Sequence, residues 1–195
     1  MNPIRRYITE LHQTLDQLPV DTIQEVIDLL YQARIDGRQI FILGNGGSAS
    51  TASHFACDLG KNARRDDFPP FRVIALTDNM AVFSAYANDE GYENVFASQL
   101  ASFVKPEDVV IGISTSGNSP NVLRAIELAN QVGARTVGFT GSDGGQLGTL
   151  VGYNIHVPST CIEQVEDIHL VLGHLICTVL RQSMEKTPSS PELLR

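Results

Sequence analysis

The chain has 195 residues, of which 43% are hydrophobic, so it is long enough to fold as one domain with a sizeable core. Its formal net charge of -8 would repel a phosphate backbone, and we therefore expect no direct nucleic acid partner. The sequence lacks an apolar run of the roughly 20 residues that a membrane span requires, and its three cysteines without CxxC spacing suit a reducing compartment. These totals predict a cytoplasmic protein without a membrane partner.

The first predicted elements are two amphipathic helices, at about residues 3–17 and 21–36. Apolar residues recur at helical spacing in both, from Ile4 to Leu18 and from Ile23 to Leu30. Asp21 can cap the second helix. We assign residues 1–36 to an N-terminal helical pair within the same domain.

From residue 39 the sequence changes to short apolar runs that end in small polar loops. We predict strands in QIFIL, FRVIAL, DVVIGI, RTVGFT and YNIHV. Helix-length segments separate them, at about residues 48–60, 79–86, 92–104, 119–132 and 144–150, with a long last helix at 162–184. Continuously apolar strands that alternate with helices are typical of a parallel sheet covered on both faces.

This pattern predicts a three-layer, doubly wound α/β domain at residues 37–184, with a five-stranded parallel sheet and an N-terminal helical appendage. The end of the chain, EKTPSSPELLR, has two prolines and no periodicity. It predicts a flexible tail at residues 185–195.

The first polar loop, GNGGSA, begins at Gly44 and formally satisfies the dinucleotide motif G-x-G-x-x-G/A. A nicotinamide site also needs an acidic residue about 20 residues further on, whereas Asp78 lies 34 residues beyond Gly44. The chain has no Gly-Lys-Ser/Thr, so a Walker phosphate loop is excluded. The dinucleotide hypothesis is therefore weak, and a simple strand-to-helix turn is the alternative.

The loop STSGNSP, which begins at Ser114, predicts a cradle for a phosphate monoester. Ser119 suits the N-cap of the following helix and Pro120 its first position. The remaining hydroxyls, with a glycine and the unpaired amides of a helix start, can bind a dianion without a lysine. Hydroxyl turns plus a cap are the alternative, but they explain only Ser119.

His54 and Asp58 are four residues apart on the predicted helix after the first loop, so their side chains lie on one face. One small ion or one substrate hydroxyl could contact both. A solvent-facing ion pair is the alternative.

The motifs GNGGSAS, GISTSGNSPNV and TGSDGG resemble the sugar isomerase (SIS) domain family, and the nearest branch looks like the phosphoheptose isomerases. The resemblance runs from about residue 3 to 184. It implies a flavodoxin-like sheet and a homotetramer with active sites between subunits. It also implies an enzyme that converts sedoheptulose 7-phosphate to D-glycero-D-manno-heptose 7-phosphate through an enediol.

The resemblance assigns roles to individual residues. It implies that Asp58 and His174 form the acid/base pair and that a divalent metal, zinc in the family, is bound by His54, Asp58, Glu166 and His174. The substrate-binding residues that it implies are Asn45, Gly46, Gly47, Ser48, Asn88, Asp89, Ser114, Thr115, Ser116, Ser119 and Glu166. We expect His169 to be a packing or supporting residue.

The sequence departs from the branch at two positions, with Asp58 in place of glutamate and Glu166 in place of glutamine. Glu166 and His174 are eight residues apart, which is about 12 Å along a helix. They can share one ion only if the helix start is unwound or two chains contribute. A non-catalytic SIS protein, acting as a sugar-phosphate sensor or as an adaptor for a partner such as a replication initiator, is the rival hypothesis.

Overall fold

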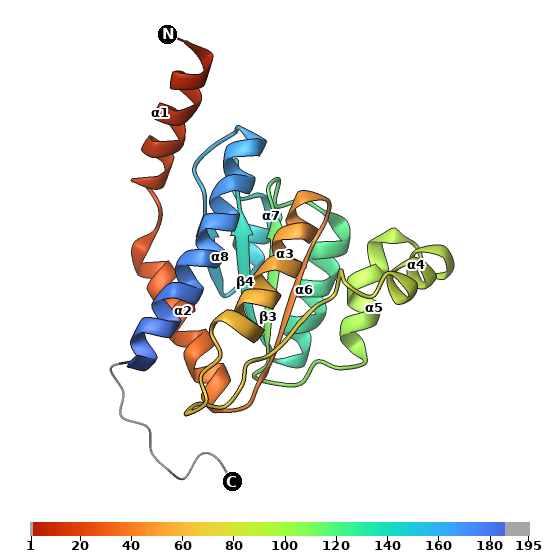
Figure 1. Ribbon diagram of the computed structural model, residues 1–195. Helices are drawn as coiled ribbons and strands as arrows, with labels where there is room; N and C mark the ends of the chain where they lie inside the picture. The colour runs from red at the N-terminus through yellow and green to blue at the C-terminus, as the bar shows by residue number, and fades with distance from the viewer. Residues whose placement is uncertain (1, 186–195) are drawn as a thin grey trace.

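The computed structural model describes residues 2–185, and five strands form one parallel sheet (Figure 1). The strands are β1 (Gln39–Gly44), β2 (Arg72–Ala75), β3 (Val109–Ser114), β4 (Arg135–Thr140) and β5 (Tyr153–His156). Their spatial order is β2-β1-β3-β4-β5, the flavodoxin-like doubly wound order. The predicted fold class is confirmed. Of the predicted tail, only Glu185 is described, as the last residue of a helix, and residues 186–195 lie outside the described residues.

Helices lie on both faces of the sheet (Figure 1). They are α1 (Pro3–Leu15), α2 (Val20–Ile35), α3 (Gly47–Cys57), α4 (Met80–Asp89), α5 (Val95–Ala101), α6 (Pro120–Val132), α7 (Gly145–Leu150) and α8 (Ile162–Glu185). A π turn, η1 (Asp58–Asn62), follows α3, and a 3-10 turn, η2 (Tyr92–Asn94), precedes α5. The helix predicted at about 48–60 is therefore confirmed up to Cys57, and only its last three residues differ, because the chain widens there into a π turn. Among residues 2–185, no helix is long and apolar enough to cross a bilayer.

Alternate residues of β1 enter two separate cores, as the geometry of a strand requires. Ile40 and Ile42 pack with residues of α2, α3 and α8. Phe41 and Leu43 pack with residues of α5, α6 and α7. All four side chains are fully buried, which confirms the expected three layers.

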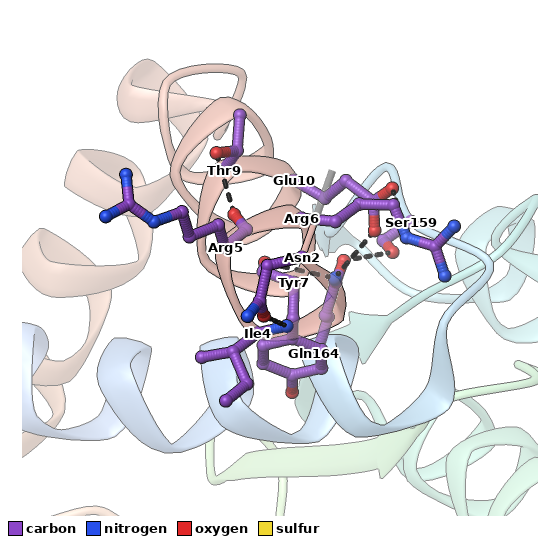
Figure 2. A network of polar contacts seen from close by, with 9 residues as sticks. All are labelled: Asn2, Ile4, Arg5, Arg6, Tyr7, Thr9, Glu10, Ser159 and Gln164. Atoms are coloured by element: carbon purple, nitrogen blue, oxygen red, sulfur yellow. Dashed lines mark hydrogen bonds and ion pairs between the residues drawn. The ribbon is translucent and has the colours of Figure 1, made fainter.

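The two N-terminal helices join the body in different ways. α2 packs on the sheet, and its Leu30 is fully buried. α1 projects from the body and reaches the start of α8 through polar contacts (Figure 1 and Figure 2). Tyr7 Oη donates to Asp167 at 2.6 Å, and Gln164 Nε2 donates to Glu10 at 3.4 Å. The bond to Asp167 raises the pKa of Tyr7 to about 12, so the phenol remains a donor at neutral pH.

The edge strand β2 is not covered on both faces, contrary to the expectation for a fully buried sheet. Ile74 in β2 is 44% exposed, and the nearby Phe103 is 59% exposed. α4 buries none of its side chains within the described part of the chain. Ile74 and Phe103 line an open pocket together with Val82 and Tyr86 of α4, so this helix leaves part of the edge uncovered.

Candidate active site and metal centre

Two polar loops meet at the carboxyl edge of the sheet. β1 and β3 are neighbours, with Gly44 opposite Ile113, so the loops that follow these strands leave the sheet side by side. The strand order reverses between β1 and β3, and ligands bind at this point in doubly wound sheets. The loops predicted to line a ligand site therefore share one edge.

The side chain of Asn45 in the first loop is held by an amide pair with α6. Asn45 Nδ2 donates to Asn121 Oδ1, and Asn121 Nδ2 donates back to Asn45 Oδ1, each at 2.8 Å. Tyr92 Oη also donates to Asn45 Oδ1, at 2.9 Å. These bonds use both acceptor positions of Oδ1 and one Nδ2 hydrogen. Asn45 can therefore offer its second Nδ2 hydrogen to a ligand.

A cavity of about 210 Å³ lies beside this loop. Asn45 and Gly46 line it together with Thr77, Phe83 and Tyr92. The rings of Phe83 and Tyr92 are packed edge to face with centroids 5.8 Å apart. This packing fixes the position from which Tyr92 reaches Asn45.

The start of α3 is in close contact with α8. A Cβ at Gly47 would lie 2.6 Å from Glu166 Oε1, so only glycine lets the Glu166 carboxylate approach the helix start this closely. There the carboxylate faces the positive end of the helix dipole. Ser48 follows in the same turn and is buried.

Within residues 2–185, the hydroxyl of Ser119 in the second loop is not used to cap the helix that follows the loop. Ser119 is the N-cap residue of α6 and Pro120 follows it, as predicted, but the Ser119 hydroxyl makes no capping hydrogen bond in the described structure. It lies 3.2 Å from the hydroxyl of the buried Ser114 instead. Ser116 Oγ accepts from a loop amide, and the Thr115 carbonyl accepts from Gly141 N at 3.1 Å. Capping therefore does not explain this loop, and the positive end of α6 can attract an anion.

Gly117 packs the second loop onto the loop before α7. Its φ is +63°, and a Cβ there would lie only 2.1 Å from the carbonyl oxygen of Gly144. The Gly117 carbonyl also accepts from Leu147 N at 2.9 Å. A glycine is required here both for the left-handed backbone and for the close contact.

Three titratable side chains from two helices converge beside α3. His54 Nε2 lies 3.0 Å from His174 Nε2 and 3.4 Å from Asp58 Oδ2. His174 Nε2 lies 3.6 Å from the same Asp58 oxygen. Asp58 is buried, whereas both imidazoles are about half exposed (side chains 49% and 51%). The cluster is therefore fixed on its inner side and open to solvent on its outer side.

This donor set fits a divalent metal. Two ligand atoms that are each 2.0–2.1 Å from a tetrahedral zinc lie about 3.3–3.4 Å from one another. The three distances in the cluster, 3.0, 3.4 and 3.6 Å, lie close to that value. Two imidazoles and one carboxylate are also a ligand set of catalytic zinc sites, in which a fourth position stays open.

Glu166 does not join the cluster within one chain. α3 and α8 lie against each other, with Glu166 beside Gly47 and His174 beside His54. Glu166 and His174 are separated by about 12 Å of helix, as their spacing predicts. The structure brings three of the four predicted ligands together, and the ligand role of Glu166 stays a prediction.

Asp58 has an amide and a thiol as further neighbours. Asn62 Nδ2 donates to Asp58 Oδ1 at 2.5 Å. Burial, and next the charge of Asp58, raises the pKa of the Cys177 thiol to about 12. His169, five residues before His174 on α8, is not part of this cluster: it is buried, contacts Phe139 and lies 3.3 Å from the Thr140 carbonyl. Its predicted packing role is confirmed.

Asn88 and Asp89 are not brought to the cluster or to the serine loop in one chain. They lie in the last turn of α4, where both are exposed and Asn88 Nδ2 donates to Asp89 Oδ1 at 2.7 Å. α4 stands apart from α3 and α8 (Figure 1). Their role in substrate binding stays a prediction.

Three residues of the site were missed from the sequence. Asn121 and Tyr92 hold Asn45, and Asn62 holds Asp58. The spacing of Asn62, four residues after Asp58, is a signal that could have been read, because side chains at this spacing meet on a helix. Asn121 and Tyr92 are 76 and 47 residues from Asn45, so local spacing gives no signal for them.

The fold and the site together define a class of protein. A profile of the SIS domain matches residues 5–141, and the chain belongs to the SIS domain family. Within the family it is similar to phosphoheptose isomerases, and it is 37% identical to the one from Thermodesulfovibrio yellowstonii over 90% of this chain and 87% of that protein.

Solved structures give the same result. A phosphoheptose isomerase from Francisella tularensis matches with a TM-score of 0.85 at 29% identity, over 92% of this chain and 96% of that one. The phosphoheptose isomerase from Neisseria gonorrhoeae matches with a TM-score of 0.84 at 27% identity, over 92% and 97%.

Proposed function

We propose that the protein is an aldose–ketose isomerase that converts sedoheptulose 7-phosphate to D-glycero-D-manno-heptose 7-phosphate. The observation that carries the proposal is the convergence of His54, Asp58 and His174 at one open site. These side chains lie in a chain whose relatives are phosphoheptose isomerases.

Isomerisation needs two proton transfers that leave the net proton count unchanged. One proton leaves C1 of the ketose and one is added at C2, while the hydroxyl on C1 loses its proton and the oxygen on C2 gains one, in the same direction, through an enediol. The carboxylate of Asp58 and the imidazole of His174 lie 3.6 Å apart, so both can reach adjacent carbons of one substrate. We assign the exchange to this pair, with one group accepting the carbon-bound proton while the other donates to the carbonyl oxygen.

The two loops bind the rest of the substrate in this proposal. Asn45 donates to a sugar hydroxyl, and the amides of Gly46 and Gly47 lie beside it at the start of α3. The second loop binds the phosphate through the hydroxyls of Ser114, Thr115, Ser116 and Ser119 and through the start of α6. The structure supports this assignment because the two loops are adjacent.

The proposed cofactor is a divalent metal, and we propose zinc. His54, Asp58 and His174 would hold it, and it would stabilise the negative charge that develops on the substrate oxygens. Because Asp58 and His174 are assigned both to the metal and to proton transfer, turnover is measured with and without added zinc.

We also propose a cytoplasmic homotetramer with active sites between subunits. The exposed side chains of Ile4 and Ile8 on α1, and of Ile74 and Phe103 beside β2, are apolar surfaces that a second copy can cover. A second copy could also bring predicted substrate residues that stand apart in one chain, such as Asp89, to the cluster.

The test is to incubate the protein, purified without a His tag, with sedoheptulose 7-phosphate and to follow the aldose product by NMR. We expect the aldose signal to grow, and to grow faster when zinc is added. If neither condition gives turnover while an active relative does so in the same assay, the proposed isomerase activity is refuted. A sugar-phosphate sensor or an adaptor is then the better hypothesis.

A further inference from the structure

The two oxygens of the Asp58 carboxylate have different partners. Oδ2 lies 3.4 Å from His54 Nε2 and 3.6 Å from His174 Nε2. Oδ1 accepts a hydrogen bond from Asn62 Nδ2 at 2.5 Å. One oxygen of the carboxylate therefore faces the two histidines, and the other is hydrogen-bonded to a neutral amide.

The π turn that carries Asn62 is firmly placed. Ala63 N donates to the Asp58 carbonyl at 2.9 Å and closes the wide turn. Leu59 and Ala63 are fully buried. The side chain of Arg34, itself buried, donates from Nη1 to the Ala63 carbonyl at 3.2 Å. The backbone under Asn62 is thus held by core packing, and π turns of this kind are frequent at functional sites.

We propose that Asn62 is a positioning residue for the metal centre. By holding Oδ1 it turns a single oxygen of Asp58, Oδ2, towards His54 and His174. Asp58 then acts as a ligand through one oxygen only. This inference rests on the proposed metal centre and assigns a new residue to it.

The physical basis is the freedom of an aspartate side chain. Rotation about its last torsion is broad, so a carboxylate without a partner on Oδ1 can turn both oxygens in or out of the cluster. A hydrogen bond to the outer oxygen removes that freedom. Loss of such an outer contact typically weakens metal binding about 10- to 100-fold.

The test measures the zinc dissociation constant by competition with a chromophoric chelator. The variants are Asn62→Ala and Asn62→Leu, which remove the amide, and Asn62→Gln, which keeps it on a longer arm. Lys61→Ala is the matched control, because Lys61 is an exposed neighbour on the same π turn. We expect zinc binding to weaken about 10- to 100-fold in the first two variants, to recover at least partly in Asn62→Gln, and to stay within about twofold in Lys61→Ala.

Thermal unfolding of each metal-free variant accompanies the titration. A wild-type unfolding temperature together with weak zinc binding supports positioning, since a purely structural role would lower the unfolding temperature as well. Wild-type affinity in Asn62→Ala and Asn62→Leu overturns the proposal, and so does a wild-type protein that binds no zinc. Wild-type protein that binds zinc without isomerising the sugar refutes the proposed function and leaves the role of Asn62 intact.

Discussion

Gly117→Ala is the substitution whose effect the structure defines most closely. A left-handed backbone costs a non-glycine residue about 1–2 kcal/mol. The added Cβ would lie 2.1 Å from the Gly144 carbonyl oxygen, so the two loops must also move apart. Overpacking of this kind costs about 1–3 kcal/mol, which gives a total loss of about 2–5 kcal/mol.

A matched control separates the two contributions. Gly133 has φ +86°, but a Cβ there would meet only Pro106 Cβ, at 3.9 Å. Gly133→Ala should therefore lose about 1–2 kcal/mol, from backbone strain alone. The assay is urea unfolding of both variants, with the Michaelis constant for the sugar phosphate measured alongside. The account predicts that Gly117→Ala is the less stable of the two and the one with the higher Michaelis constant. Equal losses of stability in the two variants would refute the claim that the serine loop is clamped against Gly144.

Three further predictions concern single side chains. His54→Ala and His174→Ala each remove a proposed ligand atom. Each should therefore weaken zinc binding in the chelator competition by more than the roughly 100-fold that the loss of an outer contact causes. Unchanged affinity would exclude the cluster as the metal site. Tyr92→Phe removes a hydrogen bond to Asn45 and should lower kcat/KM about two- to tenfold, corresponding to about 0.5–1.5 kcal/mol, and unchanged kinetics would show that Asn45 needs no such support. Burial lowers the pKa of His169 from 6.5 to about 4. As the pH falls, His169 is therefore protonated in the unfolded chain before it is protonated in the folded chain. Above pH 6.5 His169 is neutral in both states and does not change the free energy of unfolding. As the pH falls from 6.5 towards 4, protonation of the unfolded chain lowers the free energy of unfolding by about 3 kcal/mol. Urea unfolding of His169→Gln should show a correspondingly weaker loss of stability over this range, and a wild-type pH dependence would contradict the burial argument.

The fold was largely predictable from the sequence because its strands are continuously apolar. Fully buried parallel strands such as β1 and β3 leave a strong local signal, and the polar loops after them mark the edge where ligands bind. The pairing of His54 with Asp58 follows from helical spacing, and the separation of Glu166 from His174 follows from the rise of α8.

Other features of the site are set by contacts that the sequence does not encode locally. The π turn after Cys57 could not be told from a continued α-helix in the sequence. It depends on the packing of Leu59 and Ala63 into the core. The amide pair between Asn45 and Asn121 depends on the adjacency of β1 and β3. The approach of His174 to His54 depends on how α8 packs against α3, over 120 residues of sequence.

The central claim is that the buried carboxylate of Asp58 moves protons on the sugar, and one comparison tests it most directly. The turnover of sedoheptulose 7-phosphate is measured for wild-type protein, for Asp58→Asn, and for Asp66→Asn, whose side chain is fully exposed. The account predicts that kcat falls about 10²- to 10⁴-fold in Asp58→Asn, the range of a lost general acid or base, and is unchanged in Asp66→Asn. An Asp58→Asn variant that turns over within a few-fold of wild type would contradict the account.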